Sequence, residues 1–173
     1  MIYKEEQKFR QPAIWVALIF SGILIIGIFG AGIYLQIIKG QQFGNNPMSD
    51  NGLIVTFILV IILFLIVILL FGFANLKTVI TKGGIEYKFL PFHLKFHKIN
   101  WGEIEKYDVI TYNPIRDYGG WGIKTGKNSK AFNVSGNWGL LLELKSGNRI
   151  LIGTQNEVEL KRFLGKLFKT VPL

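Results

Sequence analysis

Cysteine is absent from this chain of 173 residues, and histidine is scarce. Without cysteine there are no disulfide bonds, no thiolate metal sites and no cysteine nucleophile. The two histidines, His93 and His97, lie four positions apart. If they belong to a β-strand, their side chains are about 13 Å apart, which is too far to share one metal ion without other ligands. The sequence therefore predicts neither a metal site nor a cofactor.

Charge is missing from two long stretches, Gln11 to Ile38 and Asn51 to Leu76, although the chain has a net charge of +9. A helix needs about 20 apolar residues to cross about 30 Å of hydrocarbon. Both stretches are long enough, and Phe57 to Phe71 lacks the polar stripe of a helix in a soluble protein. We predict transmembrane helices at residues 13–38 and 53–76. Because neither contains an ionisable residue, a channel or transporter is not expected.

Basic residues flank the two stretches unevenly. One lysine, Lys39, lies in the connecting segment, whereas the outer flanks carry Lys4, Lys8, Arg10, Lys77, Lys82 and Lys88. Because cytoplasmic flanks are enriched in Lys and Arg, both termini are expected in the cytoplasm of a cell-membrane protein that crosses the bilayer twice. Residues 1–12 then form a cytoplasmic segment, residues 39–52 an extracytoplasmic loop and residues 77–173 a cytoplasmic domain.

The first apolar stretch has a second interpretation, a secretory signal peptide. Basic residues precede it, and Gly30-Ala31-Gly32 is a cluster of small residues. The apolar run continues past this cluster to Ile38, which favours an uncleaved membrane anchor.

Small residues also define one face of this stretch, formed by Gly27, Gly30 and Ala31. Such a face lets another helix approach closely. The partner is either the second apolar stretch of the same chain or a second copy of the protein, and the sequence leaves both open.

In residues 77–173, apolar and polar residues alternate in the pattern typical of β-strands. Ile85, Tyr87 and Phe89 alternate with charged residues after a glycine turn, which predicts a hairpin. Phe92, Leu94 and Phe96 alternate in the same way and predict a half-buried strand that runs on towards Trp101. Further strands are expected at 106–112, 121–125, 130–135, 140–144 and 149–153, and an amphipathic helix is expected after Glu157.

The predicted fold is a membrane-embedded α-helical hairpin followed by a mostly-β domain. About seven strands are followed by one C-terminal helix, and this order of elements resembles a pleckstrin-homology (PH) domain. The resemblance implies that the strands are antiparallel and form a bent sandwich or barrel, closed by the helix. The segments Ile80 to Tyr87, Ile99 to Ile104 and Leu151 to Gln155 resemble bacterial membrane proteins in which a PH-like domain follows paired transmembrane helices. This resemblance implies a fold rather than an activity.

Basic and aromatic residues of this domain are the candidate binding residues. Lys124, Lys127 and Lys130 lie close together in sequence, with Arg116 nearby, and Lys82 lies in the first hairpin turn. They could meet lipid phosphates or form an ordinary solvated loop. Trp121, among glycines, belongs either to a recognition loop or to a tight turn that re-enters a strand. The acidic residues Glu103, Glu105 and Asp108 have no nucleophile or histidine beside them, so no enzyme is expected.

The expected function is that of a non-enzymatic interaction module. The helices would anchor the PH-like domain at the inner leaflet, where it binds a protein, anionic lipid or both, with possible homo-oligomers and no nucleic acid. The alternative is an accessory or regulatory subunit of a membrane enzyme or transporter, docked through strand addition or an apolar edge.

Overall fold

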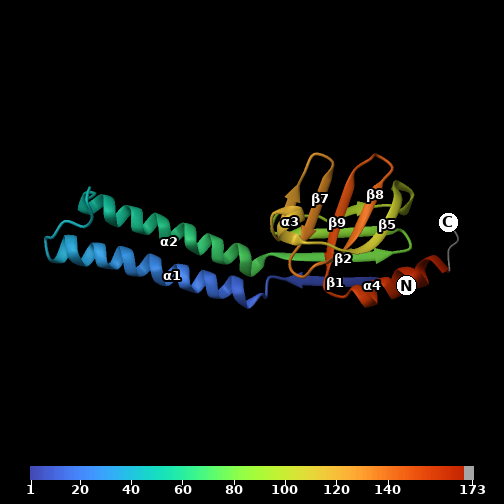
Figure 1. Cartoon of the computed structure of the whole chain (residues 1–173), viewed down its shortest axis with the longest axis horizontal. Coiled ribbons are helices and arrows are strands. Elements are labelled where there is room, and N and C mark those ends of the chain that lie inside the picture. Colours follow the sequence, from blue (N-terminus) through green and yellow to red (C-terminus); the bar gives the residue numbers. More distant parts are fainter. Residues whose placement is uncertain (170–173) are drawn as a thin grey trace. The chain divides into compact units, whose positions relative to one another are not determined.

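In the computed structural model, which describes residues 1–169, the chain forms two compact units (Figure 1). The helical unit is Arg10–Gly72. The sheet unit combines Met1–Phe9 with the chain from Phe73 onward. The N-terminal segment therefore belongs to the same unit as the β-rich domain, although 63 residues of sequence, 10 to 72, separate them.

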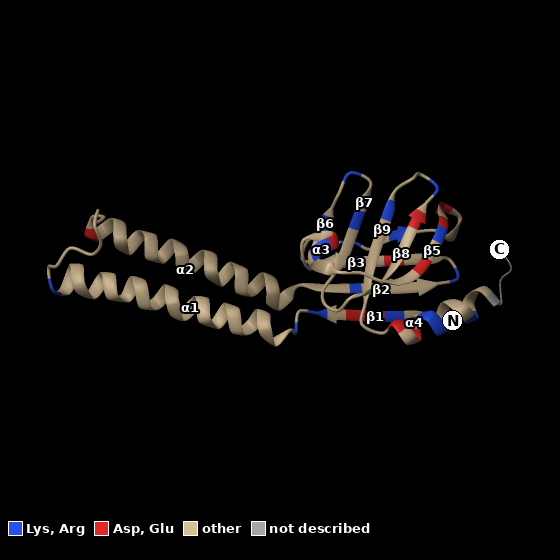
Figure 2. Cartoon of the chain, viewed as in Figure 1, with Lys and Arg blue, Asp and Glu red and all other residues tan. Residues whose placement is uncertain are grey.

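The helical unit is a pair of apolar helices. The elements are α1 (Pro12–Ile33), continued by the π-helical turn η1 (Tyr34–Ile38), and α2 (Asp50–Phe73). Both helices are long and apolar enough to cross a membrane. Figure 2 shows that charged residues are absent from α1 and from α2 after its first residue, Asp50. The predicted end of the second helix at residue 76 is wrong, because α2 ends at Phe73 and Leu76 is buried as part of a strand.

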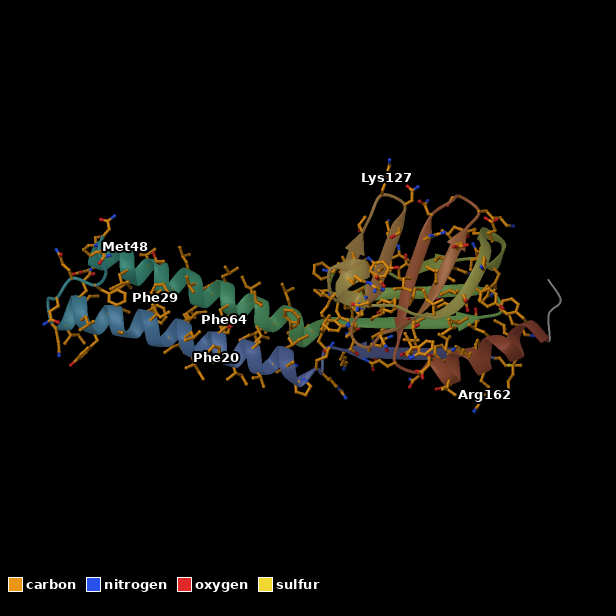
Figure 3. All side chains as sticks on the ribbon, viewed as in Figure 1. Phe20, Phe29, Met48, Phe64, Lys127 and Arg162 are labelled. Atoms are coloured by element: carbon orange, nitrogen blue, oxygen red, sulfur yellow. The ribbon has the colours of Figure 1, made fainter. Side chains whose placement is uncertain are left out.

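Aromatic side chains fill the space between α1 and α2. The rings of Phe29 and Phe57 stack with centroids 5.2 Å apart. Phe64 lies so close to Gly22 that an added Cβ there would be 2.9 Å from the ring (Figure 3). At the loop end, the side-chain amide of Gln36 donates to Asp50 Oδ1 at 2.7 Å, which ties the two helices together.

The sheet unit contains two open sheets. The four-stranded sheet runs in the antiparallel order β1 (Tyr3–Lys8), β2 (Asn75–Thr81), β3 (Gly84–Leu90) and β4 (His97–Ile99). The five-stranded sheet has the order β5 (Ile104–Thr111), β8 (Trp138–Leu144), β9 (Arg149–Thr154), β7 (Ser129–Asn133) and β6 (Gly122–Thr125). The helical elements of the sheet unit are η2 (Trp101–Glu103), α3 (Pro114–Tyr118) and α4 (Glu157–Lys169).

The predicted count of about seven antiparallel strands is not confirmed. The described residues form nine strands in two sheets, and β7 and β9 pair in parallel. Two predicted hairpins are confirmed, β2–β3 and β8–β9, and so are the strands at β5, β6 and β7 and the helix at α4. The N-terminal strand β1 was missed.

The predicted strand from Phe92 to Trp101 is wrong over most of its length. Only His97–Ile99 forms a strand, and Phe92, Leu94 and Phe96 are exposed instead of facing the core. After Pro91 the chain turns, and the backbone N–H of His93 donates to the carbonyl of Phe89 at 2.8 Å. Alternation of apolar and polar residues does not reveal which face is covered.

The core joins both sheets to α4. Leu76, Ile80 and Phe89 are fully buried in the first sheet, and Leu140 and Leu151 in the second. The helix contributes Leu160, Leu164 and Leu167. Trp101 fastens the hairpin β2–β3 to α4, because its indole N–H donates to the carbonyl of Thr81 at 2.9 Å and its ring packs edge-on against Phe168 at 4.9 Å.

Candidate interaction surfaces

Three of the predicted basic residues lie on one hairpin, β6–β7. Lys130 is next to the strand partner of Lys124, since the register pairs Lys124 with Ala131 and Thr125 with Lys130. Lys127 occupies the exposed turn between the strands (Figure 3). Lys127 and Lys130 are exposed, whereas Lys124 is half-buried and its Nζ donates to the carbonyl of Gly119 at 3.4 Å. Within residues 1–169, neither Lys127 nor Lys130 forms an ion pair, so both exposed charges can meet a partner.

The other two basic candidates lie on other elements. Lys82 is exposed in the turn between β2 and β3, in the other sheet. Arg116 lies on the short helix α3, where its Nε is 2.9 Å from Asp117 Oδ1. The five residues therefore come from three separate parts of the sheet unit: the β2–β3 turn, α3 and the β6–β7 hairpin.

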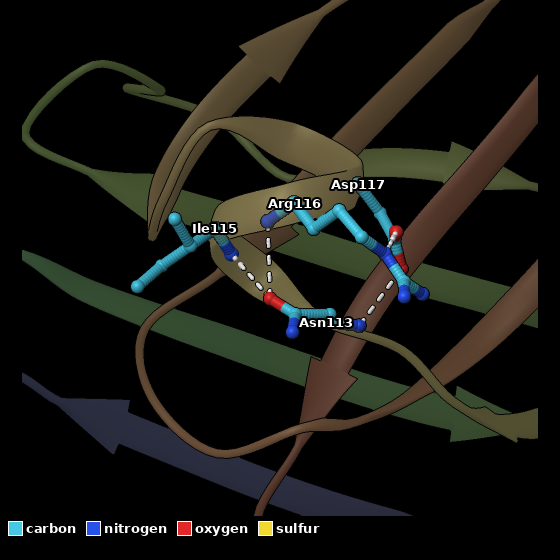
Figure 4. A network of polar contacts seen from close by, with 4 residues as sticks. All are labelled: Asn113, Ile115, Arg116 and Asp117. Atoms are coloured by element: carbon cyan, nitrogen blue, oxygen red, sulfur yellow. Dashed lines mark hydrogen bonds and ion pairs between the residues drawn. The ribbon is translucent and has the colours of Figure 1, made fainter.

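Helix α3 is held by its own cap (Figure 4). The side-chain oxygen of Asn113 accepts from the backbone N–H groups of Ile115 and Arg116 at 3.1 and 3.0 Å. The carboxylate of Asp117 accepts in turn from the backbone N–H of Asn113 at 2.8 Å. This backbone hydrogen bond and then Arg116 lower the pKa of Asp117 below its ordinary value. These bonds satisfy donors that a helix start leaves free and fix Arg116 beside Asp117.

A surface depression of about 360 Å³ lies beside α3. Its lining includes Tyr112, Arg116, Trp121 and Asn137. Burial raises the pKa of the Tyr112 hydroxyl to about 12. The depression combines an aromatic wall with a basic and an amide side chain, as a site for a polar segment of a partner would.

Trp121 lies in a turn that connects α3 to β6. Gly119 ends α3 with a φ of 69°, and Gly120 and Gly122 have φ of 120° and 114°, values that favour glycine. The Trp121 ring is half-buried, and its indole N–H donates to the carbonyl of Gly136 at 3.2 Å. The turn that re-enters a strand is therefore present, and Trp121 also contributes to the depression.

Sequence reasoning missed a buried polar cluster around Glu5. Its carboxylate accepts from the Tyr3 hydroxyl at 2.6 Å, the Thr154 hydroxyl at 2.8 Å and the backbone N–H of Gln155 at 2.7 Å. Burial, with the hydrogen bond to Glu5, raises the pKa of Tyr3 and keeps it a donor. Gln7, fully buried, donates to the carbonyl of Gly153 at 2.6 Å. The cluster joins the N-terminal strand to the β9–α4 connection. The sequence signal for this strand was the occurrence of Tyr3, Glu5, Gln7 and Phe9 at every second position.

The distance expected between the two histidines is wrong. The ring centroids of His93 and His97 are 4.3 Å apart, because the chain turns between them instead of extending. His93 also contacts Phe132 at 5.4 Å, and its Nδ1 accepts from the Phe89 backbone N–H at 3.3 Å. Within residues 1–169, no group of three or more potential metal-binding side chains occurs.

The acidic stretch contains one residue with a clear structural role. Glu103 Oε1 accepts from both the backbone and the side-chain N–H of Asn100, which caps the start of η2. Glu105 and Asp108 are exposed on β5.

The small residues of α1 also differ in their surroundings. An added Cβ would meet nothing within 4 Å at Gly27 or Gly30, and Ala31 is exposed. Of the two partners that the sequence left open for this face, α2 of the same chain packs instead beside Gly22 and Phe29.

Comparison with known protein families gave no match, and no curated protein matches the sequence significantly.

Proposed function

We propose that the chain is a membrane-anchored, non-enzymatic interaction module. Helices α1 and α2 cross the cell membrane as a hairpin, and the sheet unit, a PH-like domain, lies on the cytoplasmic side. There it binds a protein partner, anionic lipid or both through its basic hairpin and the depression beside α3.

The observation that carries this proposal is the pairing of β1 with β2. Strand β1 precedes α1 and strand β2 follows α2, yet they pair over their whole length, from Tyr3 opposite Ile80 to Lys8 opposite Asn75. Paired strands cannot be on opposite sides of a bilayer, so the chain must return to the side it left. Two crossings satisfy this requirement, and the excess of lysine and arginine on that side favours the cytoplasm.

The same pairing argues against a cleaved signal peptide. Removal of the first apolar stretch at Gly30-Ala31-Gly32 would remove β1 as well. The carboxylate of Glu5 would be lost from Thr154 and Gln155, and β2 would become an open edge. An uncleaved anchor keeps the sheet unit intact.

The exposed lysines of the basic hairpin, Lys127 and Lys130, are also compatible with a protein partner. An acidic segment of a protein would match Lys127 and Lys130.

A role as accessory subunit of a membrane complex is the second candidate. It draws support from the sheet order, in which β6 is an edge of the five-stranded sheet. An edge strand can accept an extended segment of another protein by strand addition. Homo-oligomerisation through Gly27, Gly30 and Ala31 is compatible with either candidate, because this face of α1 is open.

Labelling of single cysteines tests the membrane arrangement, since the native chain has none. Cysteine is introduced at Lys4, at Asn45 in the α1–α2 loop and at Lys127, and intact cells are treated with an impermeant maleimide. We expect labelling at position 45 before permeabilisation and at positions 4 and 127 only afterwards. The proposed topology would be rejected if position 127 were labelled from outside the cell, even with positions 4 and 45 labelled from opposite sides of the membrane.

A fluorophore at Asn128→Cys, beside Lys127, tests what the hairpin binds. The full chain is placed in nanodiscs of phosphatidylcholine with or without phosphatidylglycerol, at low and high salt. Lipid binding by the hairpin would be shown by a fluorescence change that requires phosphatidylglycerol and weakens in salt. This change should disappear in Lys127→Gln/Lys130→Gln but not in Lys145→Gln. No change would remove the lipid alternative for this hairpin and leave the protein partner.

A further inference from the structure

The loop between β3 and β4, Pro91 to Phe96, exposes three large apolar side chains. Phe92 is 63% exposed, Leu94 83% and Phe96 45%. They lie within five consecutive residues, so they form one patch instead of scattered surface positions. A contiguous exposed apolar patch is costly in water and marks a surface that meets another molecule or a membrane.

Strand register places this loop at one particular end of the first sheet. Leu90, the last residue of β3, pairs with Asn75, the first residue of β2, and Asn75 pairs with Lys8 at the end of β1. Only Ala74 separates Asn75 from Phe73, where α2 ends. The loop therefore begins at the end of the sheet where the chain leaves and re-enters the apolar helices.

Exposed apolar side chains of the sheet unit occur at this end and also elsewhere on the unit. Besides the loop, Phe73 is exposed, and so is Ile115 on α3, which Figure 1 shows at the same end of the sheet unit. Met1 and Ile2 precede Tyr3, which pairs with Ile80 near the opposite end. Val158 is exposed on α4.

Basic residues surround the apolar patch. Lys95 is part of the loop, Lys98 follows it, and Lys88 Nζ lies 5.9 Å from the ring centroid of Phe96. No acidic residue occurs in the sequence from Lys88 to Trp101. Lysines beside an apolar patch match the boundary between anionic headgroups and acyl chains, where long side chains reach the phosphates.

The loop is fixed before it meets any partner. His93 donates its backbone N–H to the Phe89 carbonyl and accepts at Nδ1 from the Phe89 backbone N–H, at 2.8 and 3.3 Å. Its ring packs against His97 and Phe132. Since these contacts hold the base of the loop while the three apolar side chains stay outside, insertion would cost little ordering entropy.

We infer that the Pro91–Phe96 loop inserts Phe92, Leu94 and Phe96 into the headgroup boundary of the bilayer that α1 and α2 cross, with Lys88, Lys95 and Lys98 at anionic headgroups. The inference rests on the proposed membrane anchorage. It adds a third attachment to the two chain connections and restricts the orientation of the sheet unit at the membrane.

Depth-dependent quenching in nanodiscs tests the insertion with the full chain. An environment-sensitive fluorophore is attached at Leu94→Cys, in phosphatidylcholine–phosphatidylglycerol nanodiscs that carry nitroxide lipids. Val158→Cys is the matched control, because Val158 is an apolar side chain that is 62% exposed on α4. Leu63→Cys, in the middle of α2, reports the membrane anchorage itself. We expect quenching at positions 94 and 63 and none at 158.

The controls separate the two hypotheses. The label at position 63 could be quenched while the label at 94 stays as accessible to water as the one at 158. This result would overturn the loop insertion and leave the anchorage intact. Absence of quenching at 63 would overturn the anchorage, and the inference with it. A label at 94 that is shielded from water without lipid quenching would assign the patch to a protein contact and also overturn the insertion.

Charge variants test the lysines separately. In the Leu94→Cys chain, Lys95→Gln and Lys98→Gln should lower the ratio of inserted to free loop by about fivefold for each lysine removed, and only when phosphatidylglycerol is present. Lys106→Gln and Lys145→Gln, equal changes of charge at exposed lysines elsewhere, should leave it unchanged. Equal effects of both pairs would overturn the assignment of Lys95 and Lys98 to headgroups.

Discussion

At the scale of single residues, the buried carboxylate of Glu5 holds the N-terminal strand to the rest of the sheet unit. Glu5→Gln keeps the size of the side chain but replaces one acceptor oxygen by an NH₂ group, which would face hydroxyl and backbone donors. We expect the free energy of unfolding to fall by about 2–4 kcal/mol, since hydrogen bonds to charged groups contribute about 1.5–3 kcal/mol each. Thermal unfolding of the full chain in detergent, followed by near-UV circular dichroism, measures this loss.

Glu6 is the matched control for this substitution. It is the next residue of β1 and its carboxylate is 3.6 and 3.5 Å from Lys8 and Lys77 at the surface. Exposed ion pairs contribute at most about 1 kcal/mol, so Glu6→Gln should change stability little. Equal losses for the two substitutions would contradict the role of the buried cluster.

His93 makes stability depend on pH. Burial, then His97 and Lys130, lower its pKa in the folded chain below the ordinary 6.5. The unfolded chain therefore binds a proton at a higher pH than the folded chain does. The stability that neutral His93 contributes is complete above about pH 6.5, falls as the pH drops through 6.5 towards the folded pKa and then levels off.

Melting temperatures between pH 8 and pH 5 test this dependence. His93→Asn retains an acceptor for the Phe89 N–H but does not titrate, so the variant should lose less stability on acidification than the native chain. Parallel pH profiles for the two proteins would show that His93 is not the titrating group.

At the scale of elements, two glycines of α1 should differ in their response to the same substitution. An added Cβ at Gly22 would lie 2.9 Å from Phe64, whereas at Gly27 nothing lies within 4 Å. Gly22→Val should destabilise the helical hairpin by about 1–3 kcal/mol relative to Gly27→Val, through overpacking. Thermal unfolding in detergent compares them, and light scattering reports whether Gly27→Val changes the oligomeric state. Equal stability of both variants would contradict the packing of Gly22 against Phe64.

Local sequence signals predicted those elements whose two faces differ clearly. In β3, Ile85, Tyr87 and Phe89 face the core and charged residues alternate with them, so the hairpin was found. In β1 the inward positions after Tyr3 are Glu5 and Gln7, whose polar groups are paired largely by residues near the other end of the chain. No local pattern reports such long-range partners.

The candidate sites show the same limit. The grouping of Lys124, Lys127 and Lys130 was predictable, because a short hairpin keeps neighbours in sequence together. The alternation of Phe92, Leu94 and Phe96 was equally regular but led to a wrong strand, since periodicity identifies a face without identifying what covers it. The contact between His93 and His97 follows from the turn that replaces that strand.

At the scale of the whole molecule, the sheet unit interrupts its own sequence with the helical unit. Its first strand and its remaining strands are joined only by way of α1 and α2, and the register brings Lys8 opposite Asn75. A fragment that starts at Lys77 would lack β1 and the first two residues of β2. Such a fragment is unsuitable for binding studies, because β2 would be cut short and left as an exposed edge.

A chimera in which a short glycine-containing turn replaces Arg10–Gly72 should fold without a membrane. The turn would join β1 to β2 as an ordinary hairpin, keep the three hydrogen bonds of Glu5 and retain the core formed with α4. We expect a soluble protein with a cooperative thermal transition and a near-UV spectrum. The matched control is the chain from Phe73 onward without β1, which should melt at a lower temperature or fail to fold, since Thr154 and Gln155 lose the carboxylate that accepts from them. Equal melting temperatures would show that β1 contributes no stability, and the argument for two membrane crossings from its pairing with β2 would then lose its basis.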